Sequence, residues 1–368
     1  MALSISPSYY WDGNDGNWST FNVNVGTPSQ QLRLLPATSL SAILVVIELG
    51  CSNSQYPANC AFLRGTLFHP DVSQDASWKP QQSSNGQPYF QLPFQNGSEQ
   101  GLPDYNGTCE AGYDVLTLDW SGKSTPVNLQ NQLIAGYAVP TPWLGMLGLS
   151  GHPSHIHNLA LSEDSPLQSL LNSKSIPGLS WAYTAGAYYR NQWGSLTFGG
   201  YDASRVDMSS AMNVNMSTPQ AQDLVVNIQS ITITVDQSTT YVTDMPITAI
   251  IDSVVPEIWL PEKACATFED VFGIVWNETE QIYLVNDTLH SAIQAQDASI
   301  TFFLADPTDA SLATNITLPY AAFDLQAKSP LAGIPGNGTS LYYFPLKRTP
   351  SSLPGFQGYL GRTFLQEA

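Results

Sequence analysis

Short runs of apolar and β-branched residues recur along the chain, and clusters of Gly, Pro, Asn and Asp separate them. Such runs between turn-forming clusters are typical of β-strands. They lie at 21–25, 32–35, 42–47, 115–118, 224–235, 249–251 and 299–304. Helical patterns are short and few, at 166–172, 261–272 and 289–295. The pattern therefore predicts a mainly β protein with a few short helices.

One pattern occurs in both halves of the chain. Leu34–Ser39 followed by Ile43–Val45 resembles Ile250–Val254 followed by Ile258–Leu260. Much later, each half carries an apolar-apolar-Gly segment, Met146-Leu147-Gly148 and Tyr359-Leu360-Gly361. Each half thus predicts a strand, a polar turn, a second strand and a distant strand that closes on glycine, which indicates an internal repeat.

Composition and charge narrow the function. The 368 residues are enough for two domains, each with its own core. With 12 Lys and Arg against 30 Asp and Glu, the net charge is −18, which excludes nucleic acid as a partner because phosphate is repelled. Charged residues make up only 11%, so Ser, Thr, Asn and Gln hydrate the surface, as suits an acidic medium.

Several features favour the secretory route. No apolar run is long enough to span a membrane, and the first residues do not form a signal peptide. The four cysteines are even in number and lack metal-ligand spacing. Eight Asn-x-Ser/Thr sequons favour an oxidising, glycosylating compartment, and hence a secreted protein or one on the outer face of the plasma membrane. They begin at Asn17, Asn96, Asn106, Asn215, Asn277, Asn286, Asn315 and Asn337.

Four motifs, in this order and spacing, resemble those of pepsin-like aspartic proteases over essentially the whole chain. They are Val25–Gln30 ("IGTPxQ"), Trp143–Leu149 ("FDGILGLA"), Leu196–Asp202 ("LxFGGxD") and Ala249–Val254 ("AIVDTG"). The resemblance implies an all-β, bilobal fold with two β-barrel-like lobes around a cleft, an N-terminal lobe at 1–205 and a C-terminal lobe at 206–368.

Segments near both ends resemble a narrower group of fungal secreted or cell-surface members, many with a membrane span beyond the protease-like region. They are Trp11–Ser19, Leu318–Gln326 and Leu360–Ala368. The chain stops where family members continue into a last strand, so we expect an ectodomain whose final strand, and any membrane attachment, lie in a segment absent from this chain.

The resemblance breaks at the catalytic pair. The family uses one Asp from each lobe, and Asp252 matches the second, but a gap-free count from Val25 places Ala37 at the first. No Asp lies between Asp15 and Asp71, so a register shift cannot supply the missing carboxylate. Two neighbouring carboxylates that share one proton, one as acid and one as base, are the basis of this chemistry. A single carboxylate cannot fill both roles.

The residues that flank the pair are also changed in part. Thr38 and Ser253 keep the hydroxyls that, by resemblance, clasp the two lobes together. Ser39 and Val254 replace the turn glycines, and a β-branched residue there predicts altered turn geometry. Tyr105 is the best match to the tyrosine of the substrate flap, although a loop tyrosine without catalytic meaning is favoured.

The family's small first-lobe disulfide corresponds to Cys51 and Cys60. Cys109 and Cys265 are left over, either bridged to each other or as free or separately paired thiols. His152, His155 and His157 lie in a Pro-containing loop that favours a solvated turn over a metal site, so neither a metal nor another cofactor is expected.

The sequence thus predicts a monomeric pseudoprotease, not an active enzyme, that binds a peptide, a protein or a cell-wall ligand in the interlobe cleft. One alternative is an active aspartic endopeptidase that uses Asp252 with an unrecognised carboxylate such as Asp71 or Asp104. Another is a proteinaceous inhibitor of a hydrolase, which recognises its target through surface loops.

Overall fold

The computed structural model describes residues 2–53, 56–70, 76–83, 85–94, 102, 105–119, 125–154, 156, 159, 162–216, 223–243, 246–331, 340–350 and 356–368. The chain forms two compact units. Unit 1 comprises Met1–Gly13, Trp18–Tyr188 and Trp193–Asp202, and unit 2 comprises Asn14–Asn17, Tyr189–Gln192 and Ala203–Ala368. The main boundary therefore lies three residues before the boundary predicted from the sequence. The short segments Asn14–Asn17 and Tyr189–Gln192 belong to unit 2, although unit 1 surrounds them in the sequence.

Unit 1 is built on a large sheet that curls back on itself, because β3 pairs with both β4 and β8. In the described residues its strand order is β2 (Pro7–Asp12), β3 (Trp18–Val25), β4 (Gln30–Ala37), β10 (Met146–Gly148), β5 (Ile43–Val46), β9 (Val127–Tyr137), β8 (Thr108–Leu118) and β6 (Lys79–Pro80), with β7 (Tyr89–Gln91) also on β8. A second sheet joins β1 (Leu3–Ile5), β12 (Gln192–Phe198) and β11 (Trp181–Ala187).

Short helices complete unit 1. They are η1 (Glu48–Cys51), α1 (Cys60–Leu63) and α2 (Pro166–Asn172), while η2 (Tyr188–Arg190) begins at the last residue of this stretch of unit 1 and continues into unit 2. Helix α2 begins where Pro166 follows Ser165, whose hydroxyl accepts a hydrogen bond from Gln168 N at 3.2 Å. Its Leu167 and Leu170 are buried in the core that Phe21, Val23 and Val25 of β3 also line. The alternation of these β3 residues with half-exposed Asn22 and Asn24 is the period of two that the sequence shows.

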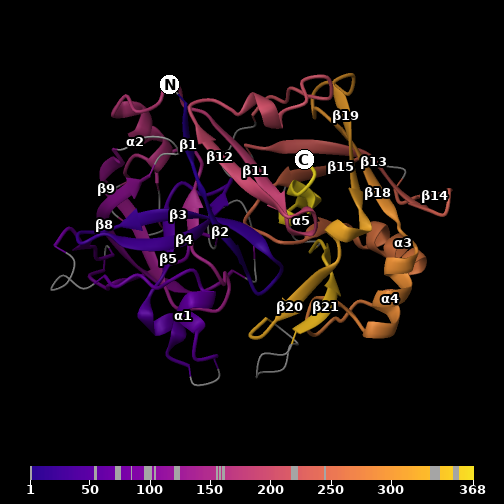
Figure 1. The fold of residues 1–368 in the computed structure, drawn as a ribbon, viewed down its shortest axis with the longest axis horizontal. Coiled ribbons are helices and arrows are strands. Elements are labelled where there is room, and N and C mark those ends of the chain that lie inside the picture. The colour runs from indigo at the N-terminus through magenta and orange to yellow at the C-terminus, as the bar shows by residue number, and fades with distance from the viewer. Residues whose placement is uncertain are drawn as a thin grey trace. The chain divides into compact units, whose positions relative to one another are not determined.

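Unit 2 contains a second large sheet (Figure 1). Its order in the described residues is β19 (Ala313–Pro319), β18 (Ser299–Ala305), β13 (Val225–Val235), β15 (Ile247–Ile251), β23 (Gly358–Leu360), β16 (Ile258–Leu260) and β22 (Leu346–Arg348), with β14 (Ser238–Tyr241) on β13. A smaller sheet joins β17 (Tyr283–Val285), β21 (Ser340–Phe344) and β20 (Leu325–Lys328). The helices are η3 (Ala203–Arg205), α3 (Glu262–Phe272), α4 (Asp287–Ala295), η5 (Tyr320–Ala322) and α5 (Arg362–Leu365).

Aromatic side chains fill the core of unit 2. Phe268 and Phe272 of α3 meet Phe344 of β21, with ring centroids 6.1 and 5.2 Å apart. Helix α3 ends at Gly273, whose φ of 68° is a left-handed conformation that glycine adopts without strain. Both α3 and α4 contribute buried residues to the same core as β18.

The strands and helices predicted from the sequence pattern are confirmed. Each predicted run falls on a strand, and the three helical patterns coincide with α2, α3 and the C-terminal part of α4. No described helix has the length and apolar character needed to cross a membrane.

The short segment Asn14–Asn17 joins unit 2 although it lies near the N-terminus. The Tyr343 hydroxyl donates to the Asp15 carbonyl at 2.6 Å, and Lys328 N donates to the Asn14 carbonyl at 2.6 Å. The loop is therefore fixed to the small sheet of unit 2 by hydrogen bonds.

Two arginines are buried in unit 1. Arg33 forms a bidentate ion pair with Asp12, at 2.9 Å for both bonds, and Thr20 donates to the same carboxylate at 2.6 Å. Arg64 instead donates to several backbone carbonyls, among them those of Gly50, Val139 and Trp143. The charged groups of this unit therefore fix loops to strands within the core.

We expect Arg33→Ala to lower the free energy of unfolding by about 3–5 kcal/mol, because it leaves the buried Asp12 carboxylate without its cation. Arg190→Ala is the matched control. It removes a half-exposed partner of Glu367, and should cost no more than about 1 kcal/mol. Urea unfolding followed by tryptophan fluorescence measures both, and equal losses would contradict the prediction.

Candidate functional site

The sheet register places Ala37 and Asp252 at equivalent positions in the two units. In unit 1, β4 runs parallel to β10 with Ala37 opposite Gly148. In unit 2, β15 runs parallel to β23 with Ile251 opposite Leu360, so Asp252 follows opposite Gly361. Leu147 also pairs with Ile43, which lies six residues after Ala37. In the same way Leu360 pairs with Ile258, which lies six residues after Asp252. The repeat seen in the sequence is therefore a repeat of strand pairing.

Glycine is required at both crossings. Gly148 N donates to the Ala42 carbonyl at 3.1 Å, and Gly361 N donates to the Glu257 carbonyl at 3.2 Å. A Cβ atom would lie 2.5 Å from the Ala42 oxygen at Gly148, and 2.2 Å from the Glu257 oxygen at Gly361. No other residue allows this approach of backbone to backbone, which explains the apolar-apolar-Gly motif of each half.

The turn at Asp252 is buried and locally ordered. Asp252, Ser253 and Val254 have no exposed surface, and Asp252 Oδ1 accepts a hydrogen bond from Val254 N at 2.9 Å. Val254 is not among the residues with positive φ, so valine fits here without left-handed backbone strain. The valine was expected to alter the geometry of the turn, but the hydrogen bond from Val254 N to Asp252 is present.

The equivalent turn of unit 1 has no carboxylate at its first position. Ala37 is fully buried, and its carbonyl accepts from Leu149 N at 3.0 Å and from Leu40 N at 3.4 Å. The methyl group of Ala37 cannot accept a hydrogen bond from the Ser39 N–H. At the equivalent place in unit 2, Asp252 Oδ1 accepts one from Val254 N. Glu48, the one acid between Asp15 and Asp71, lies in η1 with a mostly exposed side chain 3.8 Å from His69. Asp71 and Asp104 lie outside the described residues.

A buried arginine braces the Asp252 turn. Arg362 Nη1 donates to the carbonyls of Ser253 at 2.9 Å and Val254 at 2.7 Å, while Nη2 pairs with Asp15 at 2.6 Å. The sequence analysis did not select Arg362 or Asp15 as site residues. Their only signal was position, since Arg362 directly follows the motif glycine and Asp15 lies in the Trp11–Ser19 segment.

Two further groups near this turn titrate abnormally. Burial, together with the charge of Asp252, raises the pKa of Tyr359 above its ordinary value, so its hydroxyl stays protonated. Burial raises the pKa of Glu257, although Lys347 and a 3.2 Å hydrogen bond from Trp259 Nε1 favour the charged form. The surroundings of the turn therefore favour neutral acidic groups.

The other predicted site residues are placed as follows. Thr38 is buried beside Ala37. Tyr105 lies in the connection between β7 and β8, where its ring, 6% exposed, packs 5.2 Å from Phe94. Its contact with Phe94 makes it part of the loop's own apolar cluster, and its role as a flap tyrosine stays a prediction.

The cysteines form one disulfide, between Cys51 and Cys60. A bridge between Cys109 and Cys265, one of the alternatives left open, is wrong for this structure, because both are reduced and buried. Cys109 lies by Gln91 of β7, and Cys265 lies in the aromatic core of unit 2, so each thiol is enclosed by its own unit. Burial raises the pKa of both thiols to about 12, which keeps them protonated and unreactive.

Six sequon asparagines are described. Asn106, Asn215, Asn286 and Asn315 are exposed, whereas Asn17 and Asn277 are half-buried. Asn96 and Asn337 lie outside the described residues. The described part of the chain contains no group of three or more His, Cys, Asp or Glu side chains arranged to hold a metal ion, and His155 and His157 fall outside it.

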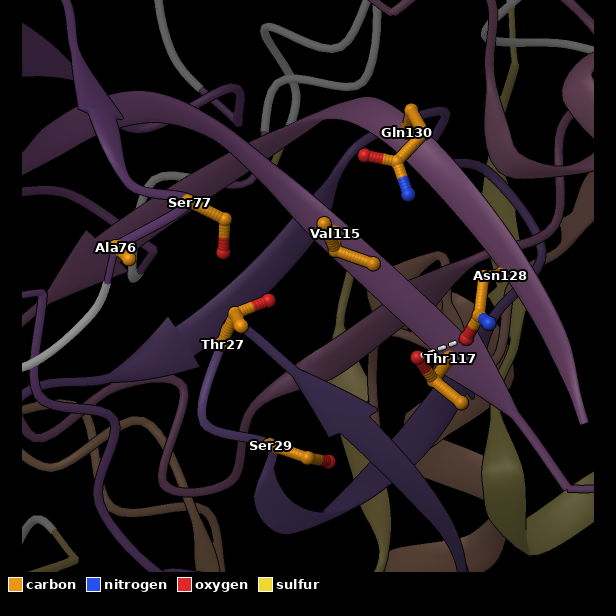
Figure 2. A pocket seen from close by; sticks show the side chains of 9 residues that line it. Thr27, Ser29, Ala76, Ser77, Val115, Thr117, Asn128 and Gln130 are labelled. Atoms are coloured by element: carbon orange, nitrogen blue, oxygen red, sulfur yellow. Dashed lines mark hydrogen bonds between the residues drawn. The ribbon is translucent and has the colours of Figure 1, made fainter.

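Unit 1 also has an open hollow of about 510 Å³ between the turn after β3 and strands β8 and β9. Figure 2 shows the side chains of Thr27, Ser29 and Ser77 around Val115, and a hydrogen bond of 2.7 Å from Thr117 to Asn128. Its polar lining is uncharged and contains no residue of the Ala37 turn. It has no group that could act as a nucleophile's general base.

Comparisons with known proteins support the fold. No family model matches the sequence, and no curated protein sequence matches it either. Among 377 matching chains of solved structures is the crystal structure of an aspartic proteinase from Irpex lacteus. The likeness covers 100% of this chain and 92% of that one, with a TM-score of 0.58 and 16% sequence identity. The chain therefore has the pepsin-like aspartic proteinase fold.

Proposed function

We propose that this protein is a catalytically impaired homologue of the aspartic proteases, which binds a peptide, a protein or a cell-wall ligand without cleaving it. The observation that carries the proposal is the fully buried Ala37 at the register position that Asp252 occupies in unit 2. Hydrolysis by this fold needs one carboxylate as acid and one as base. A single Asp252 can supply only one of the two.

The secretory location belongs to the same proposal. We place the protein outside the cell, secreted or on the outer face of a fungal plasma membrane, as a monomeric glycoprotein. The exposed sequon asparagines and the disulfide support this, since both are typical of that route. The abundance of uncharged polar residues and the raised pKa of Glu257 suit an acidic medium.

We expect the glycosylated protein to show no cleavage of a broad peptide library between about pH 3 and 6, the range in which a carboxylate dyad works. Asp252→Asn and a transition-state inhibitor of aspartic proteases are the controls. Cleavage that both abolish would sink the proposal, and would favour an active enzyme that uses a second carboxylate such as Asp71 or Asp104. If no cleavage occurs, capture of an intact hydrolase in a pull-down would favour an inhibitor.

We expect Ala37→Asp alone to leave the protein inactive on casein at about pH 3–4, where a restored dyad would be protonated once. The new carboxylate would lie in a fully buried turn that still carries Ser39 in place of glycine. The circular dichroism spectrum and Tm show whether the variant is folded. Robust turnover by the folded variant contradicts the prediction.

We expect Glu257→Gln to stabilise the protein increasingly as pH rises. Because the folded-state pKa of Glu257 is raised, the folded protein holds this proton more tightly than the unfolded chain, and stability is lost as pH rises above about 4.5. Glutamine removes this loss, so the gain in Tm should be near zero at about pH 4 and should grow as the pH rises towards 7. A gain that is the same at both pH values in thermal scans argues against the raised pKa.

A further inference from the structure

Unit 2 contains a cavity of about 510 Å³ that the proposed activity does not use. It lies between the start of α3, the end of β22, the segment before β17 and the segment before β23. Its lining includes Glu262, Trp276, Glu278, Arg348 and Phe356. The volume is within the range of small-molecule sites, about 300–1,000 Å³.

The polar groups of this cavity are centred on Arg348. Its Nη1 pairs with Glu262 Oε1 at 2.9 Å and Glu278 Oε1 at 3.2 Å, and its Nη2 pairs with Glu269 Oε1 at 2.9 Å. Three carboxylates around one guanidinium leave a net negative charge, which disfavours an anionic ligand. The second oxygens of the mostly exposed Glu262 and Glu278 can accept hydrogen bonds from hydroxyl or amide groups.

Two buried polar atoms at this cavity have no hydrogen-bond partner among the described residues. They are Arg348 Nε, a donor, and Thr349 Oγ1, which both donates and accepts. Beside them, Trp276 and Phe356 supply apolar surface. The exposed carboxylate oxygens of Glu262 and Glu278, together with the aromatic edges, suit a neutral sugar, whose hydroxyls donate hydrogen bonds and whose C–H faces are apolar.

A sequon lies on the rim of the same cavity. Asn277 stands between the lining residues Trp276 and Glu278, and Thr279 completes the sequon. Asn277 Oδ1 accepts from Thr279 N at 3.0 Å and from Glu280 N at 3.1 Å. Asn277 N also donates to the Ile282 carbonyl at 3.1 Å, so the loop is held at both ends. These bonds fix the side chain and leave Nδ2, the atom that carries a glycan, outside the turn's hydrogen bonds.

We propose that the first sugars of a glycan on Asn277 occupy this cavity. The glycan starts at the rim, so its effective concentration at the cavity is on the order of millimolar, and even weak complementarity is enough to fill it. The chain's own glycan therefore occupies the cavity in preference to a free sugar. This inference rests on the glycosylating compartment of the proposed function, but not on the loss of catalysis.

The test uses the full chain secreted from a eukaryotic host with high-mannose glycans. Glycopeptide mass spectrometry first measures occupancy at Asn277 and Asn315. An endoglycosidase that cuts between the first two N-acetylglucosamines then trims the native protein. Asn315, exposed on β19, is the matched control site. A docked glycan should be trimmed about tenfold more slowly at Asn277 than at Asn315, because only the undocked fraction is cleaved.

The variant Glu262→Ala, Glu278→Ala keeps the sequon and removes two rim carboxylates. It should bring the rate at Asn277 to within about twofold of the rate at Asn315, with the protein still folded by Tm. An occupied Asn277 that is trimmed as fast as Asn315 overturns the docking and leaves the glycosylating compartment intact. An Asn277 without a glycan overturns the docking too, and bare asparagines at every sequon would also remove the proposed compartment.

A last arm separates the tethered sugar from an external one. N,N′-diacetylchitobiose is titrated into Asn277→Gln and followed by calorimetry. Weak binding that Glu262→Ala, Glu278→Ala abolishes supports the sugar chemistry of the cavity. Binding of the free disaccharide together with unprotected trimming at Asn277 overturns the proposal in favour of an external ligand.

Discussion

The close passage of one backbone beneath another at Gly148 and Gly361 is the constraint on which each half of this fold depends. At Gly361 a Cβ would lie 2.2 Å from the Glu257 oxygen, closer than any side chain allows. This approach lets β23 pair in parallel with β15 and antiparallel with β16, so the turn that carries Asp252 is enclosed by strands. The same arrangement around Gly148 encloses the turn of Ala37.

Because backbone hydrogen bonds enclose these turns, the strand pairing around them does not need a carboxylate at position 37. The carbonyl of Ala37 still accepts from Leu149 N, and the methyl group is fully buried without a polar group to satisfy. Replacing Asp by Ala at such a position removes chemistry and a buried charge but leaves the pairing of β4, β10 and β5 unchanged. The fold alone therefore does not fix the reaction that a chain carries out, and function has to be argued from the site.

The sequence was sufficient to predict those features of the fold that depend on the local pattern of residues. The apolar run along β3, the helical pattern at 166–172 and the glycine motifs were sufficient to predict strands, helices and the repeat. It could not predict contacts that depend on distant residues. Nothing in the sequence near Asp15 shows that Asn14–Asn17 joins unit 2, or that Arg362, 347 residues later, pairs with Asp15. The reduced state of Cys109 and Cys265 depends on burial in separate cores, which cysteine spacing does not reveal.

The buried arginines differ in how far their hydrogen bonds depend on carboxylates. An ion pair depends on pH through its carboxylate, whose protonation turns the pair into an ordinary hydrogen bond. Backbone carbonyls do not titrate. Arg64 donates to several backbone carbonyls, and Arg362 donates to the carbonyls of Ser253 and Val254 in addition to its pair with Asp15. The turn around Asp252 is thus fixed in part by hydrogen bonds from Arg362 to backbone carbonyls, which do not titrate.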